Sequence, residues 1–115
     1  MAIVTFLAPM KLKAGVTGAD LEKFWKEEYL PNVSELPGYK VTIHKGVYGK
    51  RADQYLYEGH FESNERRFEI FPIEGQATPS EEMQQWMAAN PAWEKLLSFF
   101  DETWYAEFTN YIALD

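Results

Sequence analysis

Two alternating stretches on either side of a short polar segment constrain the fold of this 115-residue chain more than any other feature. In residues 39–48 (YKVTIHKGVY) and 54–62 (QYLYEGHFE), apolar and polar residues alternate, which is typical of strands with one buried face. The segment between them, GKRAD, has the composition of a turn. The sequence therefore predicts an antiparallel β-hairpin over residues 39–62.

Further strand and helix patterns flank the hairpin. Residues 2–8 (AIVTFLA) are rich in β-branched and aromatic residues, and residues 104–114 form a last candidate strand. One helical segment precedes the hairpin and another follows it. The order strand, helix, strand, strand, helix, strand predicts an α+β, ferredoxin-like βαββαβ fold with a four-stranded antiparallel sheet. We expect a single domain over residues 1–115, with both helical segments on one face of the sheet.

Helix caps and prolines set the expected helix boundaries. Thr17 and Asp20 form a capping-box pattern that opens the first helix, and Pro31 should kink or shorten that helix. The second helix opens at Ser80. Asn90-Pro91 should divide it into two segments, because a proline disfavours helical geometry in the residue before it.

Composition excludes several functional classes. The chain has 18 acidic and 11 basic residues and a net charge of -7, which argues against nucleic acid and membrane surfaces as partners. It has no cysteine, which excludes disulfides, thiolate metal ligands and cysteine nucleophiles. A signal-peptide pattern and a bilayer-spanning apolar run are both missing from the sequence, so a cytoplasmic location is expected. The basic pairs Lys50-Arg51 and Arg66-Arg67 are expected to be solvated.

The first strand is apolar on both of its faces, with Ile3 and Leu7 alternating with Val4 and Phe6. An antiparallel sheet with one face in water should instead alternate between apolar and polar residues. Two helical segments cover only one face of the sheet. We therefore expect a homodimer in which the uncovered sheet faces pack together, because large exposed apolar patches are uncommon on monomers.

Two segments resemble a known group of proteins. LEKFWKEEYLPNVSELPGYKVTIHKGV resembles a stretch of EthD-like chains, and SEEMQQWMAANPAWEKLLSF resembles a helix common to NIPSNAP-like and EthD-like chains. Together they span roughly residues 18–100. The resemblance implies the dimeric α/β-barrel superfamily, in which two ferredoxin-like sheets face each other around a cavity. That superfamily includes cofactor-free monooxygenases, isomerases, polyketide cyclases and heme-handling proteins.

One position departs from the EthD-like pattern. Where those chains carry the histidine of their motif, this sequence has Tyr29 in YLP. A role carried by that histidine therefore does not transfer to this chain.

The register of the hairpin decides which residues share a face, since a shift of one residue moves every side chain to the other face. If Gly49 opposes Asp53, the first hairpin strand turns its aliphatic residues toward the helices, namely Val41, Ile43 and Val47. A shift of one residue would instead bury charged residues among these aliphatic side chains. The first register is therefore expected.

The same register places both histidines of the chain on the face away from the helices. It sets His44 opposite Glu58 and Thr42 opposite His60. A carboxylate beside an imidazole fixes its tautomer and raises its basicity, as a general base requires. The candidate catalytic residues are therefore His44, Glu58 and His60. The candidate ligand-binding residues on neighbouring strands are Thr5, Thr42, Tyr105, Glu107 and Tyr111.

Several interpretations of this cluster remain open. The three residues can be ordinary cross-strand polar pairs. Two histidines and a carboxylate can also hold iron or zinc, and either histidine could bind a heme, although no cofactor is expected. The functional hypothesis is a cofactor-independent isomerase, cyclase or monooxygenase that acts on an apolar small molecule by acid–base chemistry. The alternative is a non-catalytic dimeric module that binds a small ligand or only assembles.

Overall fold

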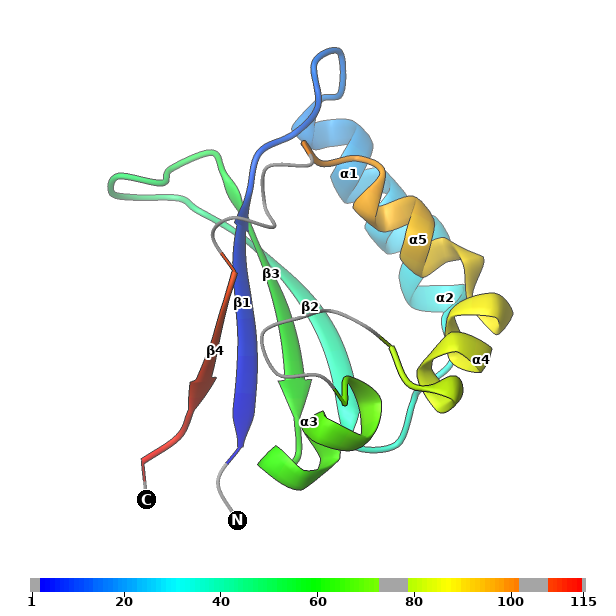
Figure 1. The fold of residues 1–115 in the computed structure, drawn as a ribbon. Coiled ribbons are helices and arrows are strands. Elements are labelled where there is room, and N and C mark those ends of the chain that lie inside the picture. Colours follow the sequence, from blue (N-terminus) through cyan, green and yellow to red (C-terminus); the bar gives the residue numbers. More distant parts are fainter. Residues whose placement is uncertain (1–2, 73–78, 102–107, 115) are drawn as a thin grey trace.

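The computed structural model describes residues 3–72, 79–101 and 108–114 (Figure 1). In chain order its elements are β1 (Val4–Met10), α1 (Gly18–Phe24), the π-helix η1 (Trp25–Tyr29), α2 (Leu30–Asn32), β2 (Tyr39–Lys45), β3 (Tyr55–Phe61), α3 (Asn64–Ile70), α4 (Glu81–Ala89), α5 (Pro91–Leu97) and β4 (Thr109–Ile112). The strands form one antiparallel sheet in the order β2-β3-β1-β4. This arrangement confirms the predicted α+β, ferredoxin-like fold.

The sheet has one face covered by helices. In Figure 1, α1, α2, α4 and α5 form a layer on one side of the strands, and α3 follows the end of β3. Toward this layer β3 turns Tyr55, Tyr57, Gly59 and Phe61, which are all buried. We call the opposite side of the sheet the open face. By strand parity its residues are Thr5, Leu7, Pro9, Lys40, Thr42, His44, Leu56, Glu58, His60, Thr109 and Tyr111.

The hairpin register differs from the predicted one by two residues. His44 pairs with Leu56, and Thr42 pairs with Glu58, because β2 ends at Lys45 and a longer loop follows. The loop is closed between Gly46 and Gln54, where the Gly46 N–H donates to the Gln54 carbonyl at 2.8 Å. A shift of two residues keeps each side chain on its predicted face but changes its partner across the strands.

Two glycines and one aliphatic residue define this loop. A Cβ at Gly46 would lie 2.2 Å from the Arg51 carbonyl oxygen, and Gly49 has φ +102°, so both positions require glycine. Val47 was predicted to face the helices, and this prediction is wrong. It lies beyond the end of β2 in the projecting hairpin tip and is 85% exposed.

The first strand continues past its predicted end and includes Pro9. Pairing with β4 covers only Val4 to Leu7 of β1, so Pro9 lies where β1 has no neighbour on that side among the described residues. A proline is tolerated at such an edge because its missing N–H removes no ladder hydrogen bond. The last strand is described only from Thr109, and residues 104–107 of the predicted strand lie outside the described ranges.

The first helix begins as predicted and changes its geometry before Pro31. Thr17 caps α1, and its capping box with Asp20 is present. Because Pro31 has no N–H, a regular helix cannot continue through it. The preceding turn is a π-helix in which the Leu30 N–H donates to the Trp25 carbonyl, and the helix ends at Asn32.

The predicted break at Asn90-Pro91 is confirmed. Helix α4 ends at Ala89, α5 begins at Pro91, and Asn90 between them has φ −129° and ψ 68°. Trp93 in α5 is buried and donates a hydrogen bond of 2.9 Å to the Tyr57 hydroxyl. This bond ties the second helical segment to the sheet.

The prediction that Arg66 and Arg67 are solvated is wrong, whereas Lys50 and Arg51 are exposed as expected. Arg67 is buried and donates to the Phe71 carbonyl at 3.2 Å. Only 12% of the Arg66 side chain is exposed. The sequence pattern of α3 could not show this, because two partners of Arg66, Pro37 and Glu82, come from segments far away in the chain.

Candidate functional site

The three candidate catalytic residues lie together on the open face. His44 Nδ1 forms an ion pair with a carboxylate oxygen of Glu58. The other carboxylate oxygen of Glu58 lies 3.7 Å from His60 Nε2. The same nitrogen of His60 shares a 3.1 Å hydrogen bond with the Thr42 hydroxyl. His44 reaches Glu58 diagonally across the strands and not from the directly opposite position.

The environments of the two histidines differ. The His44 side chain is 64% exposed, whereas that of His60 is 33% exposed. Burial lowers the pKa of His60 below its ordinary 6.5, and the positive charges of His44 and Lys40 lower it further. His60 therefore carries a neutral imidazole near neutral pH, which is the form that can accept a proton.

A pocket of about 500 Å³ lies at the start of β2 and includes His60 in its wall. It is lined from both faces of the sheet, by α2, by Trp86 of α4 and by the linker of residues 33–38. We call it the β2-edge pocket. Its lining residues are Ile3, Tyr29, Leu30, Val33, Ser34, Glu35, Leu36, Pro37, Gly38, Tyr39, Lys40, Val41, His60, Phe61, Glu62 and Trp86.

The linker wall of this pocket is fastened to the α4–α5 break. The buried Asn90 side-chain oxygen accepts from the Ser34 N–H at 2.8 Å and from the Ser34 hydroxyl at 3.1 Å. The Asn90 amide nitrogen donates to the Trp86 carbonyl at 2.9 Å. The Trp86 indole donates to the Ser34 carbonyl, also at 2.9 Å. Ser34 is thus held by three hydrogen bonds to two residues, Asn90 at the helix break and Trp86 of α4.

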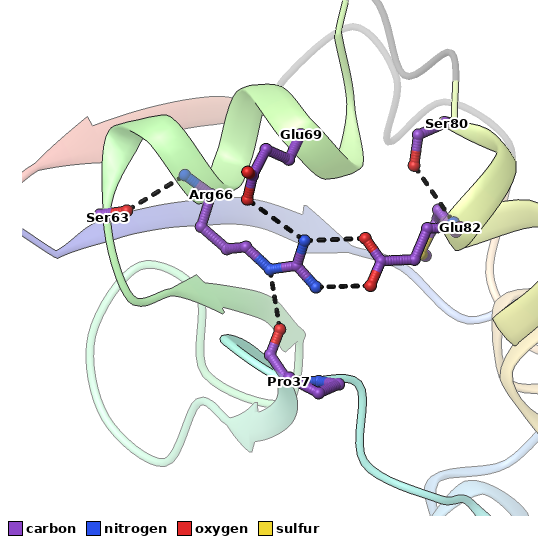
Figure 2. A network of polar contacts seen from close by, with 7 residues as sticks. Pro37, Ser63, Arg66, Glu69, Ser80 and Glu82 are labelled. Atoms are coloured by element: carbon purple, nitrogen blue, oxygen red, sulfur yellow. Dashed lines mark hydrogen bonds and ion pairs between the residues drawn. The ribbon is translucent and has the colours of Figure 1, made fainter.

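Arg66 fastens the other end of the linker, as Figure 2 shows. Its Nε donates to the Pro37 carbonyl at 2.9 Å, and its two terminal nitrogens each donate at 2.8 Å to one carboxylate oxygen of Glu82. A further contact of 3.3 Å reaches Glu69. Gly38 has φ +76°, and a Cβ there would lie 2.9 Å from Arg66 Cγ. The pocket wall is therefore held in place without a ligand, as expected of a preformed binding site.

Two buried tyrosines, Tyr29 and Tyr39, line the β2-edge pocket. The hydroxyls of Tyr39 and Tyr57 share a hydrogen bond of 3.1 Å, and Trp93 donates to Tyr57. The ring of Tyr29 stacks on Trp25, with 4.4 Å between centroids. Burial raises the pKa of Tyr29, Tyr39 and Tyr57 above the ordinary value of 10, so their hydroxyls stay protonated.

The predicted ligand-binding residues are only partly placed by the structure. Thr5, Thr42 and Tyr111 lie on the open face, with Thr5 between His60 and Tyr111 in the sheet, and they do not line the β2-edge pocket. Tyr105 and Glu107 lie outside the described residues. A smaller pocket of about 210 Å³ contains His44, together with Pro9, Lys45, Gly46, Arg51, Gln54, Tyr55 and Leu56.

Two kinds of feature, a metal-binding cluster and a membrane-spanning helix, are missing from the described part of the chain. Within residues 3–72, 79–101 and 108–114, no group of three His, Cys, Asp or Glu side chains is arranged to hold a metal ion. No helix in these ranges is both long and apolar enough to span a bilayer.

Sequence reasoning missed most of the pocket wall. The site residues predicted from the sequence do not include Trp86, and Tyr29 enters only as a departure from a family motif. A usable signal was the segment 33–38, a short irregular stretch between a helix ended by Pro31 and a predicted strand. Such loops beside a sheet edge often carry binding residues.

Comparisons with known proteins bear on the fold. No protein-family model and no curated protein matches the chain. A solved structure from Bordetella bronchiseptica, provisionally named an antibiotic biosynthesis monooxygenase, aligns with a TM-score of 0.52 at 15% identity. The alignment covers 100% of this chain and 98% of that one. The alignment shows that the two chains share a ferredoxin-like α+β fold.

Two further solved structures are similar. An EthD family protein from Bacillus halodurans aligns with a TM-score of 0.47 and 11% identity, covering 100% of this chain and 99% of that chain. A NIPSNAP family protein of unknown function from Agrobacterium tumefaciens aligns with a TM-score of 0.46 and 17% identity, covering 96% and 86%. These two structures come from the EthD and NIPSNAP groups that the sequence resembles.

Proposed function

We propose that this chain binds an apolar small molecule in the β2-edge pocket and that His60 acts on it as a proton acceptor. The observation that carries the proposal is a preformed pocket of about 500 Å³ with a neutral histidine in its wall. Its volume suits a molecule of two or three fused rings. Most of its lining is aliphatic or aromatic, which favours an apolar ligand over a sugar or nucleotide.

The cluster behind His60 supports acid–base chemistry. Glu58 lies 3.7 Å from His60 Nε2, so a carboxylate stands beside the imidazole that would take up the proton. Burial and the charges of His44 and Lys40 still hold the pKa of His60 below its ordinary value. A neutral imidazole in this setting can remove a proton next to a carbonyl group. That step is shared by isomerisation and cyclisation, and proton transfer by itself requires no cofactor.

Binding in the β2-edge pocket is tested by a charge placed on its lip. Leu30 is 57% exposed and lines the pocket, whereas Val47 is 85% exposed and lies in the hairpin tip. We expect Leu30→Glu to weaken binding of prodan, a fluorescent aromatic ketone, by roughly tenfold, because a carboxylate replaces an apolar contact. Val47→Glu is the matched control and should bind as the wild type does. Equal affinities in all three proteins would contradict binding at this site.

Proton abstraction is tested by deuterium exchange. In heavy water, the wild type should accelerate exchange of the methylene protons beside the prodan carbonyl, as followed by NMR, and His60→Gln should not. The rate should persist below pH 6.5 and fall as His60 becomes protonated, because the pKa of His60 lies below that value.

The alternative function is ligand binding without catalysis. It is favoured by the hydrogen bond of 3.1 Å between His60 Nε2 and Thr42, which occupies one ring nitrogen. Prodan binding without accelerated exchange would support this alternative and contradict the acid–base proposal.

We also propose that the protein forms a homodimer through the open face. Among residues 3–72, 79–101 and 108–114, no element packs on that face, although Leu7, Pro9, Leu56 and Tyr111 all belong to it. A second copy packed there would also enclose the cluster of His44 and Glu58.

A further inference from the structure

Tyr29 is a buried tyrosine whose hydroxyl has no hydrogen-bond partner among the residues that the structure describes. Only 4% of the residue is exposed, and it lies in the wall of the β2-edge pocket. Its ring is fixed by stacking on Trp25, four residues earlier in the π-helix. Within the described ranges, no hydrogen bond to the Tyr29 hydroxyl is present. A hydroxyl in such a buried residue that has no protein partner must bond to water or to a ligand.

The Tyr29 oxygen borders open space. Among the described residues, the side-chain polar atom that is both sealed from solvent and unpaired is Oδ1 of Asn110. The Tyr29 oxygen is not in that condition, so it keeps some contact with solvent-accessible space. The β2-edge pocket is the cavity that this residue lines.

A second hydroxyl proton is left over in the same wall. Trp93, Tyr57 and Tyr39 have three donor hydrogens between them but form two hydrogen bonds. Because Trp93 donates to the Tyr57 oxygen, the Tyr57 hydroxyl can in turn donate a hydrogen bond to the Tyr39 oxygen. The Tyr39 proton is then free, and Tyr39 also lines the pocket.

The charges around the pocket select against an anionic ligand. Glu35 and Glu62 contribute two carboxylates to its lining, whereas Lys40 contributes one ammonium group. With His60 neutral, the lining carries a net negative charge. The surplus tyrosine protons therefore suit an uncharged acceptor oxygen better than a carboxylate or phosphate.

We propose that Tyr29 is a ligand-binding residue and that the ligand is an apolar molecule with an uncharged oxygen acceptor, such as a ketone or quinone carbonyl. This inference rests on the proposed function, because it names the chemistry of the molecule that occupies the β2-edge pocket. Tyr29 donates a hydrogen bond to the acceptor oxygen, and the aromatic walls contact the apolar remainder.

The test compares two probes that differ in their carbonyl group. Prodan carries a ketone, and dimethylaminonaphthalene is the same fused ring system without it. Tyr29→Phe should weaken prodan binding by about tenfold and leave dimethylaminonaphthalene binding unchanged, since only the ketone loses a hydrogen bond. Tyr48→Phe is the matched control, because Tyr48 is 96% exposed in the hairpin tip. It should affect neither probe.

The outcomes separate this inference from the proposed function. Suppose that both probes bind the wild type and that Leu30→Glu weakens both. If Tyr29→Phe then changes the affinity for neither probe, the Tyr29 assignment is wrong, but binding in the pocket stands. An equal loss for both probes in Tyr29→Phe would show a structural role only and would also overturn the assignment. If neither probe binds the wild type, the proposed function and this inference fail together. Thermal unfolding of Tyr29→Phe should match the wild type, because no existing hydrogen bond is removed.

Discussion

Replacing Asn90 with alanine is expected to lower the free energy of unfolding by about 2–4 kcal/mol. The residue is 3% exposed. Its side-chain oxygen accepts from the Ser34 N–H, and its amide nitrogen donates to the Trp86 carbonyl. Alanine leaves both of these backbone groups without a partner. Both hydrogen bonds are part-buried, and each group left unpaired costs about 1–2 kcal/mol. Urea unfolding followed by circular dichroism measures the difference.

Ser34→Ala is the matched control for this prediction. It removes the weaker hydroxyl bond to Asn90 at 3.1 Å but keeps the backbone bond at 2.8 Å. Its expected cost is about 0.5–1 kcal/mol. Similar losses in the two variants would mean that Asn90 does not fasten the linker. Asn90→Ala should also weaken prodan binding, because the linker forms one wall of the β2-edge pocket.

Leu56→Glu is expected to convert a dimer of about twice the 13.4 kDa chain mass into a monomer. Leu56 lies on the open face between His44 of β2 and Pro9 of β1. In a face-to-face dimer, glutamate at this position would bury a charge against the partner sheet. Burial of an unpaired carboxylate costs several kcal/mol, which is enough to dissociate a dimer at micromolar concentration. Sedimentation velocity measures the mass of both proteins.

The control for this prediction is Leu30→Glu, which makes the same exchange on the helix-covered side. It should sediment as the wild type does. A wild-type protein that sediments as a monomer at micromolar concentration would refute the proposed dimer. Because Leu56 does not line the β2-edge pocket, Leu56→Glu should still bind prodan, which separates assembly from ligand binding.

The sequence by itself determined the elements and the faces of the strands. The capping box of Thr17, the break at Pro91 and the alternation in β2 and β3 all act within a few residues of the chain. Such local preferences depend on backbone geometry that the sequence states directly. They also placed His44, Glu58 and His60 on one face. A register shift of two residues leaves every side chain on the same face of the sheet, so the error in register did not change this result.

Only the tertiary structure decided the partners and the pocket. The hairpin register depended on where Gly46 and Gln54 close the loop, and a two-residue error left the alternation pattern unchanged. The buried position of Arg66 depended on Pro37 and Glu82, which lie 29 and 16 residues away. Packing likewise decided that no described residue comes within hydrogen-bonding distance of the Tyr29 hydroxyl. Contacts between distant segments arise from packing, which no local pattern in the sequence specifies.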